Sequence, residues 1–195
     1  RHGSQQTVQI DNAFDIVADI PDLGTLTEGL QIDEHIVNAY FKLLKNQSRK
    51  CKKNKKILVL PMNFYLSLEL SDPHNQYPKE MQLFAKSTPQ ETIYQALSTT
   101  YFGKKTMNDF DEIIFPCRVD NPNPDAASDH WIVIRIDNHD SHPIIITYDS
   151  MNLAYDAVID NINKFRDFQQ ISPITRNYQY GTYGPKQINT NDCGA

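Results

Sequence analysis

The sequence has few cysteines and no long apolar run, and each shortage excludes a class of protein. Its three cysteines are an odd number without metal-ligand spacing, so neither a disulfide scaffold nor a zinc site is expected. The longest apolar run, 57–62, is far shorter than the ~20 residues that a membrane-spanning helix needs. A composition of 39% hydrophobic and 22% charged residues is typical of a globular protein. We therefore expect an intracellular protein in a reducing compartment, the cytoplasm or nucleus.

Positive charge is scarce outside one segment. Arg49 to Lys56 holds six of the 19 basic residues and no acidic one, so the remainder carries 13 basic and 24 acidic residues, or −11. The simplest interpretation of this run is a solvated loop. The alternatives are a docking patch for an acidic partner, a nuclear-import signal or a nucleic-acid contact. An acidic body argues against nucleic acid as the main partner.

The order of the expected elements predicts one α+β domain. We exclude residues 1–4 as an expression-tag scar, interpret 5–24 as an N-terminal arm and assign 25–195 to the domain. Helices are expected from Asp33, over 89–102 and over 155–168, and strands over 57–60, 113–119, 131–136 and 144–148. One apolar face of the first helix is expected to hold Ile36, Val37, Tyr40, Phe41 and Leu44, and one apolar face of the last helix Val158, Ile159, Ile162 and Phe165. Segment 63–70 fits either a helix or a strand. Because helices precede a run of mainly antiparallel strands, a central sheet flanked by helices is expected.

Two of the expected strands form a hairpin that brings a histidine near an aspartate. If Ile136 pairs with Ile144, His130 lies opposite Ser150, one step from Asp149. Directly opposed residues have Cβ atoms ~5 Å apart, so a small adjustment lets the two side chains meet. Such a pair fixes the tautomer of the imidazole and stabilises its protonated form.

A histidine–aspartate pair of this kind needs a nucleophile, and Cys193 is the candidate. It stands between Asp192 and Gly194 in a turn-rich segment. A thiol beside an imidazolium becomes a thiolate at neutral pH, the species that attacks a carbonyl carbon. The backbone amide of Cys193 and the side-chain amide of Gln187 are candidate donors to the resulting oxyanion.

Three segments together resemble a known enzyme family. They are DHW at 129–131, YDS at 148–150 and QINTNDCG at 187–194. Their order and spacing resemble the ubiquitin-like-protein proteases of clan CE, the family of the SUMO-specific proteases. Residues 26–44 look like the opening helix of that family, and IIFPCRVDN looks like its strand before the histidine. The resemblance implies the clan CE variant of the papain-like fold.

The resemblance also implies roles for particular residues. Cys193 would be the nucleophile, His130 the general base, Asp149 the residue that orients it and Gln187 the oxyanion donor. Trp131 would cover the extended tail of the substrate, where a flat indole over a narrow channel admits only glycine. The implied reaction is hydrolysis after the Gly-Gly terminus of ubiquitin, SUMO or NEDD8 by a monomer that needs no metal or cofactor.

Two features leave alternatives open. The family's cysteine begins a long helix, and the sequence ends two residues after Cys193, so we expect the natural protein to continue past Ala195. A catalytically silent module that binds a modifier is one alternative. Another is an acetyltransferase of the YopJ type, which shares the order of the triad.

The composition, rich in Asn, Ile and Lys, would suit an intracellular bacterium whose effector acts in the host cytoplasm.

The remaining thiols and histidines have simpler interpretations. Cys51 is expected to be an exposed thiol in the basic run, and Cys117 a buried packing residue of a strand. His139 and His142 lie with two aspartates between the hairpin strands, where a polar turn is favoured over a metal site.

Overall fold

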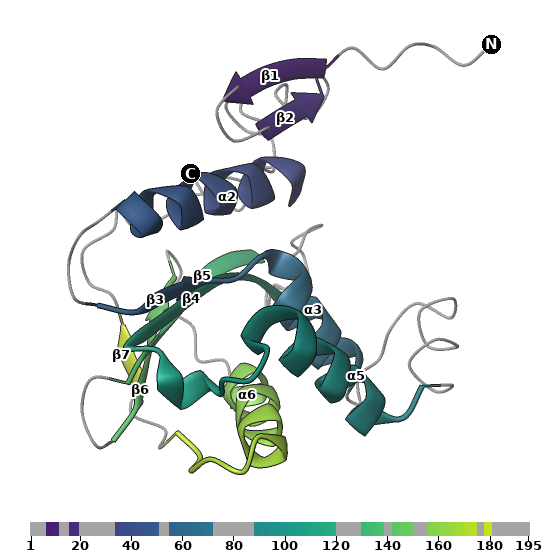
Figure 1. The fold of residues 1–195 in the computed structure, drawn as a ribbon, viewed down its shortest axis with the longest axis vertical. Coiled ribbons are helices and arrows are strands. Elements are labelled where there is room, and N and C mark those ends of the chain that lie inside the picture. The colour runs from purple at the N-terminus through teal and green to yellow at the C-terminus, as the bar shows by residue number, and fades with distance from the viewer. Residues whose placement is uncertain are drawn as a thin grey trace.

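The strands form two sheets of very different size in the computed structural model (Figure 1). The small sheet pairs β1 (Thr7–Asp11) with β2 (Ile16–Asp19), and the large one has five strands. The combination of this sheet with helices confirms the expected α+β class. The structure describes residues 7–11, 16–19, 34–50, 55–71, 88–119, 130–138, 142–149, 156–174 and 178–180.

The large sheet follows chain order across its width. Its strands are β3 (Ile57–Val59), β4 (Glu112–Val119), β5 (His130–Asp137), β6 (Ile144–Tyr148) and β7 (Tyr178–Tyr180). The two central pairings, β4 with β5 and β5 with β6, are antiparallel, and the short outer pairings are parallel. The four expected strands are confirmed. The strand β7 was not expected, because three residues are too few to show an alternating pattern.

The helices confirm three expectations and decide the ambiguous segment. They are α2 (Glu34–Lys50), α3 (Met62–Leu70), α5 (Gln90–Leu97) and α6 (Asp156–Phe168). A π-helical turn, η1 (Ser98–Phe102), extends α5, and a 3₁₀ turn, η2 (Met107–Asp109), precedes β4. Segment 63–70 is helical. Phe64 and Leu68 are four residues apart, so a helix places both on one face, and both are buried in the core.

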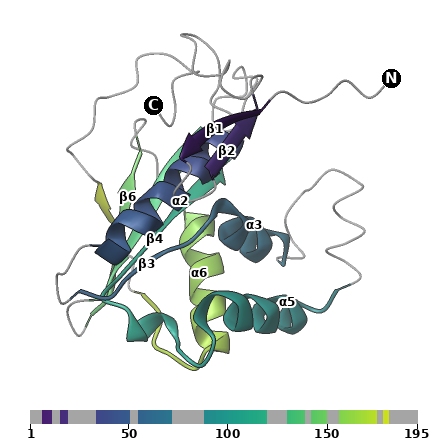
Figure 2. The same cartoon turned by 45° about the horizontal axis from the view of Figure 1, so that its top comes forward.

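The main core lies between the sheet and helices α3, α5 and α6 (Figures 1 and 2). On β5, Ile132, Ile134 and Ile136 face this core, as the two-residue period of a strand requires. Phe64 of α3 lies at its centre and is fully buried. Its ring contacts four other aromatic rings at centroid distances of 5.3 to 6.0 Å, those of Tyr101, Phe102, Phe115 and Phe165.

Helix α2 lies on the opposite face of the sheet, between the sheet and the β1–β2 hairpin (Figure 1). The expectation that Tyr40 shares a buried face with Phe41 is wrong, since Tyr40 is 58% exposed. Ala39 and Phe41 are both buried, although a helix places them about 160° apart. Because α2 contacts β2 as well as β3 and β4, it buries two sides, and Tyr40 lies between them.

Candidate active site

His130 and Asp149 meet at one end of the large sheet, as the sequence predicts. His130 is the first residue of β5, and Asp149 directly follows the last residue of β6. The imidazole Nε2 lies 2.6 Å from Oδ1 of Asp149, and the two side chains are only 1% and 0% exposed. A carboxylate can only accept, so Nε2 carries the proton in this bond. Nδ1 is then the ring nitrogen that can exchange a proton with a reacting group.

The register that joins these strands differs by one residue from the expected one. Ile136 pairs with Ile145, not with Ile144, and the last pair of the ladder is Val133 with Tyr148. The difference matters because a slip of one residue turns every side chain to the other face of a sheet. In the expected register, Asp149 would lie opposite Trp131 and face away from His130.

The observed register places the pair on one face. Continued by one step, it sets Asp149 opposite Ile132, which shares a face with His130. The two side chains are therefore diagonal neighbours, a separation that a long side chain can bridge. The conclusion that they meet is confirmed, but the expected pairing of Ile136 with Ile144 is wrong.

Trp131 lies on the opposite face of the sheet from its neighbour His130. It is 6% exposed and packs with Met62 at the start of α3 and with Val37 of α2. The backbone N–H of Met62 donates to the side chain of Asn38 at 3.2 Å, which ties α3 to α2 at this point. The indole thus belongs to a small second core at the same end of the sheet as the His130–Asp149 pair.

A small pocket opens beside this second core. Met62, Tyr65, Leu66, Glu69 and Arg118 line it. Arg118 is exposed on β4 and lies directly opposite Trp131 in the antiparallel ladder. This arginine was not singled out from the sequence, because a lone basic residue near the end of a strand carries no signal of its own.

Cys117 is fully buried in β4, as expected, within the main core. Burial raises the pKa of its thiol well above the usual value, and the charge of Glu69 adds to the effect, while a hydrogen bond with Tyr65 opposes it. The thiol is therefore protonated at neutral pH and is a poor nucleophile. Cys117 is a packing residue.

We expect native Cys117 to resist alkylation. At pH 8 its reaction with iodoacetamide should be at least about 100-fold slower in the folded protein than in denaturant, because it is both buried and protonated. Peptide mass spectrometry measures the labelling at each cysteine. Rapid labelling of Cys117 without denaturant would contradict this assignment.

Several candidate residues lie outside the described part of the chain. These are the proposed nucleophile Cys193, the proposed oxyanion donor Gln187, and Cys51, His139 and Asp140. His142 is described and exposed. The described residues contain no group of three or more His, Cys, Asp or Glu side chains placed to hold a metal ion. Within that same part, no helix is both long and apolar enough to cross a membrane.

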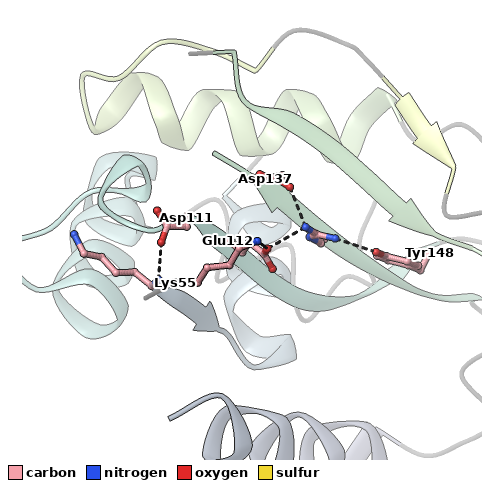
Figure 3. Close-up of polar contacts among 7 residues, drawn as sticks. Lys55, Asp111, Glu112, Asp137 and Tyr148 are labelled. Atoms are coloured by element: carbon pink, nitrogen blue, oxygen red, sulfur yellow. Dashed lines mark hydrogen bonds and ion pairs between the residues drawn. The ribbon is translucent and has the colours of Figure 1, made fainter. Parts of the chain in front are cut away.

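A charged cluster on the sheet was also not expected from the sequence. Figure 3 shows it on strands β4, β5 and β6 and the segment before β3; its residues are Lys55, Glu112, Arg135, Asp137 and Tyr148. The sequence held a signal, because Arg135 and Asp137 alternate with isoleucines along β5. Two charges with period two on a strand mark a polar face.

Comparison with known proteins identifies relatives of this chain. Residues 30–195 match the model of the Ulp1 protease family, C-terminal catalytic domain. No curated protein matches in sequence. Among solved structures, a de-sumoylating protease is 16% identical with a TM-score of 0.64, and the match covers 98% of this chain and 68% of that protein. The SUMO protease Ulp1, with its catalytic cysteine oxidised to a sulfinic acid, is 18% identical with a TM-score of 0.58, over 98% and 73% of the two chains.

Proposed function

The chain belongs to the Ulp1 protease family, a family of cysteine proteases that act on ubiquitin-like proteins, and on this premise we propose that it hydrolyses the bond after a modifier's Gly-Gly terminus. The observation that carries the proposal is the buried bond of 2.6 Å between His130 and Asp149. A buried histidine that donates to a carboxylate is held in a single tautomer and orientation. This is the arrangement that a catalytic base requires.

In the proposed mechanism, Cys193 is the nucleophile. Nδ1 of His130 takes the proton of its thiol, and the imidazolium is stabilised by Asp149 on the other side of the ring. The thiolate attacks the carbonyl carbon of the terminal glycine and forms a tetrahedral intermediate. The amide of Gln187 and the backbone N–H of Cys193 donate to its oxyanion.

The reaction then proceeds through acylation of the cysteine and hydrolysis of the acyl-enzyme. His130 gives its proton to the leaving amine, the C–N bond breaks, and a thioester joins Cys193 to the modifier. Water gives a proton to His130 as it attacks this thioester, the C–S bond breaks, and His130 returns the proton to the sulfur. The products are the free thiol and the carboxylic acid of the modifier, which ionises to the carboxylate. Every proton in the cycle passes through His130, so its orientation by Asp149 governs both stages.

Trp131 is proposed to select the glycines. It lies one residue from His130 along β5, at the end of the sheet where the chemistry would occur. Most of the indole is packed against Met62 and Val37, so the proposed contact with a substrate tail uses only its exposed edge. A tail that passes along this edge would have little room for side chains, which favours Gly-Gly over other termini. Two of the solved structures that resemble this chain are named as a de-sumoylating protease and a SUMO protease, which makes SUMO a natural first substrate to test.

Probes made of SUMO, ubiquitin or NEDD8 with a C-terminal electrophile test the proposal directly. We expect the protein to capture at least one probe covalently, with the adduct at Cys193 by peptide mass spectrometry. The matched control is Cys193→Ala, which should retain its fold and form no adduct. Capture by none of the three would overturn the proposed specificity.

The modifier probes and a parallel assay with labelled acetyl-CoA separate the other hypotheses. Binding of a probe without an adduct would support a silent module, and transfer of label from acetyl-CoA to the protein would support an acetyltransferase. The family match favours the protease over both.

A further inference from the structure

Two carboxylates face each other across the sheet. Glu112 of β4 lies directly opposite Asp137 of β5 in the antiparallel ladder, and Glu112 is only 8% exposed. Like charges at directly opposed positions repel, so this pair destabilises the sheet unless a cation lies between them. Arg135 provides it, with Nη2 donating to Oε1 of Glu112 at 3.0 Å and to Oδ2 of Asp137 at 2.9 Å (Figure 3).

A second cation completes the charge balance. Nζ of Lys55 donates to the same Glu112 oxygen at 2.8 Å. The cluster thus contains two cations and two anions, and its arginine side chain is only 25% exposed. Because it is partly buried and donates to two carboxylates, the guanidinium is restrained in its position on the sheet.

The restrained guanidinium reaches the third strand. Its Nη1 donates to the hydroxyl of Tyr148 at 3.5 Å. Tyr148 is the last residue of β6 and lies opposite Val133 of β5 in the last pair of the ladder. The residue that follows it is Asp149. Arg135 therefore holds β6 to β5 one residue before the carboxylate that binds His130.

At the end of β6, a hydrogen bond between the strands has its largest effect on the position of Asp149. The ladder stops at Tyr148, so Asp149 has no ladder pair of its own with β5. The placement of Asp149 relative to His130 depends on the position and register of the residue before it. A shift of one residue there would turn the carboxylate to the other face of the sheet.

We propose that Arg135 is a positioning residue, which holds Tyr148 so that Asp149 meets His130. This inference rests on the proposed function only for its catalytic consequence, because the His130–Asp149 bond exists whether or not the protein is a protease. Arg135 acts through Tyr148, and its role is separate from that of the groups that exchange protons.

The test observes the bond itself by NMR. A buried imidazole N–H bonded to a carboxylate gives a downfield proton signal that exchanges slowly with water, and it can be measured in the 195-residue chain without turnover. We expect this signal of His130 to exchange about three- to tenfold faster in Arg135→Gln and in Tyr148→Phe, the effect of one lost hydrogen bond on local opening. Arg135→Lys should restore part of the protection.

The matched control is Lys55→Met, which removes a charge from the same cluster without touching β6. Its His130 signal should stay within about twofold of the parent. If Arg135→Gln does not fold, Tyr148→Phe decides, since it removes only a hydroxyl. An unchanged signal in Tyr148→Phe, or an equal loss of protection in Lys55→Met, would overturn the proposal. Because probe capture plays no part in this measurement, its result is independent of the proposed protease activity.

Discussion

Replacement of Asp149 by asparagine is expected to lower kcat/KM by about 10²–10⁴-fold, the contribution of a well-placed acid–base residue. The substitution keeps the size of the side chain and its place beside Nε2 of His130. An amide, however, can donate a proton to Nε2 and so favours the tautomer that carries its proton on Nδ1. That tautomer cannot accept the proton of a thiol at Nδ1, and the charged imidazolium loses its counter-ion.

The control for this prediction is Asp167→Asn, which changes an exposed carboxylate of α6. Its kcat/KM should stay within about twofold of the parent, because an exposed substitution that contacts neither His130 nor Asp149 has little effect. Initial rates on a fluorogenic modifier substrate give both values. A loss of less than tenfold in Asp149→Asn would show that Asp149 does not orient the base.

Replacement of Phe64 by alanine is expected to lower the free energy of unfolding by about 3–5 kcal/mol, the cost of deleting a buried ring. Phe64 is fully buried, and edge-to-face contacts with four other rings would be lost with it. Because small domains are stabilised by only about 5–15 kcal/mol, this single change would remove a large part of the total. Urea unfolding, followed by circular dichroism, measures the difference.

Tyr40→Ala is the matched control, since it removes an aromatic ring of similar size that is 58% exposed. We expect it to change the free energy of unfolding by less than about 1 kcal/mol. Equal effects of the two substitutions would mean that α3 is not the centre of the core. The comparison also tests the finding that Tyr40 lies outside the buried sides of α2.

The elements of the core were predictable because each shows its own period. On α6, Val158, Ile159, Ile162 and Phe165 repeat with helical spacing, and all four are buried as expected. The strand β5 alternates as a half-covered strand should. Tyr40 was misplaced for the opposite reason: α2 is packed on two sides, and a hydrophobic pattern shows which residues are apolar but not how many neighbours a helix has.

The site was predictable in part. Motif spacing selected His130 and Asp149 as partners, and the structure joins them. The predicted register between β5 and β6 was wrong by one residue. Hairpin register depends on the conformation of the connection as well as on the apolar pattern. The Arg135 cluster was missed because its members come from four separate segments.

The sequence by itself determined the family, the α+β class and the candidate residues for the chemistry, since these depend on local periods and on motifs that a chain carries in any conformation. Only the tertiary structure decided which face each side chain occupies. It set Asp149 on the face of His130, set Trp131 on the other, and brought Arg135 to Tyr148. The physical reason is that the register between strands, and not the order of residues within one, fixes which side chains meet across a sheet.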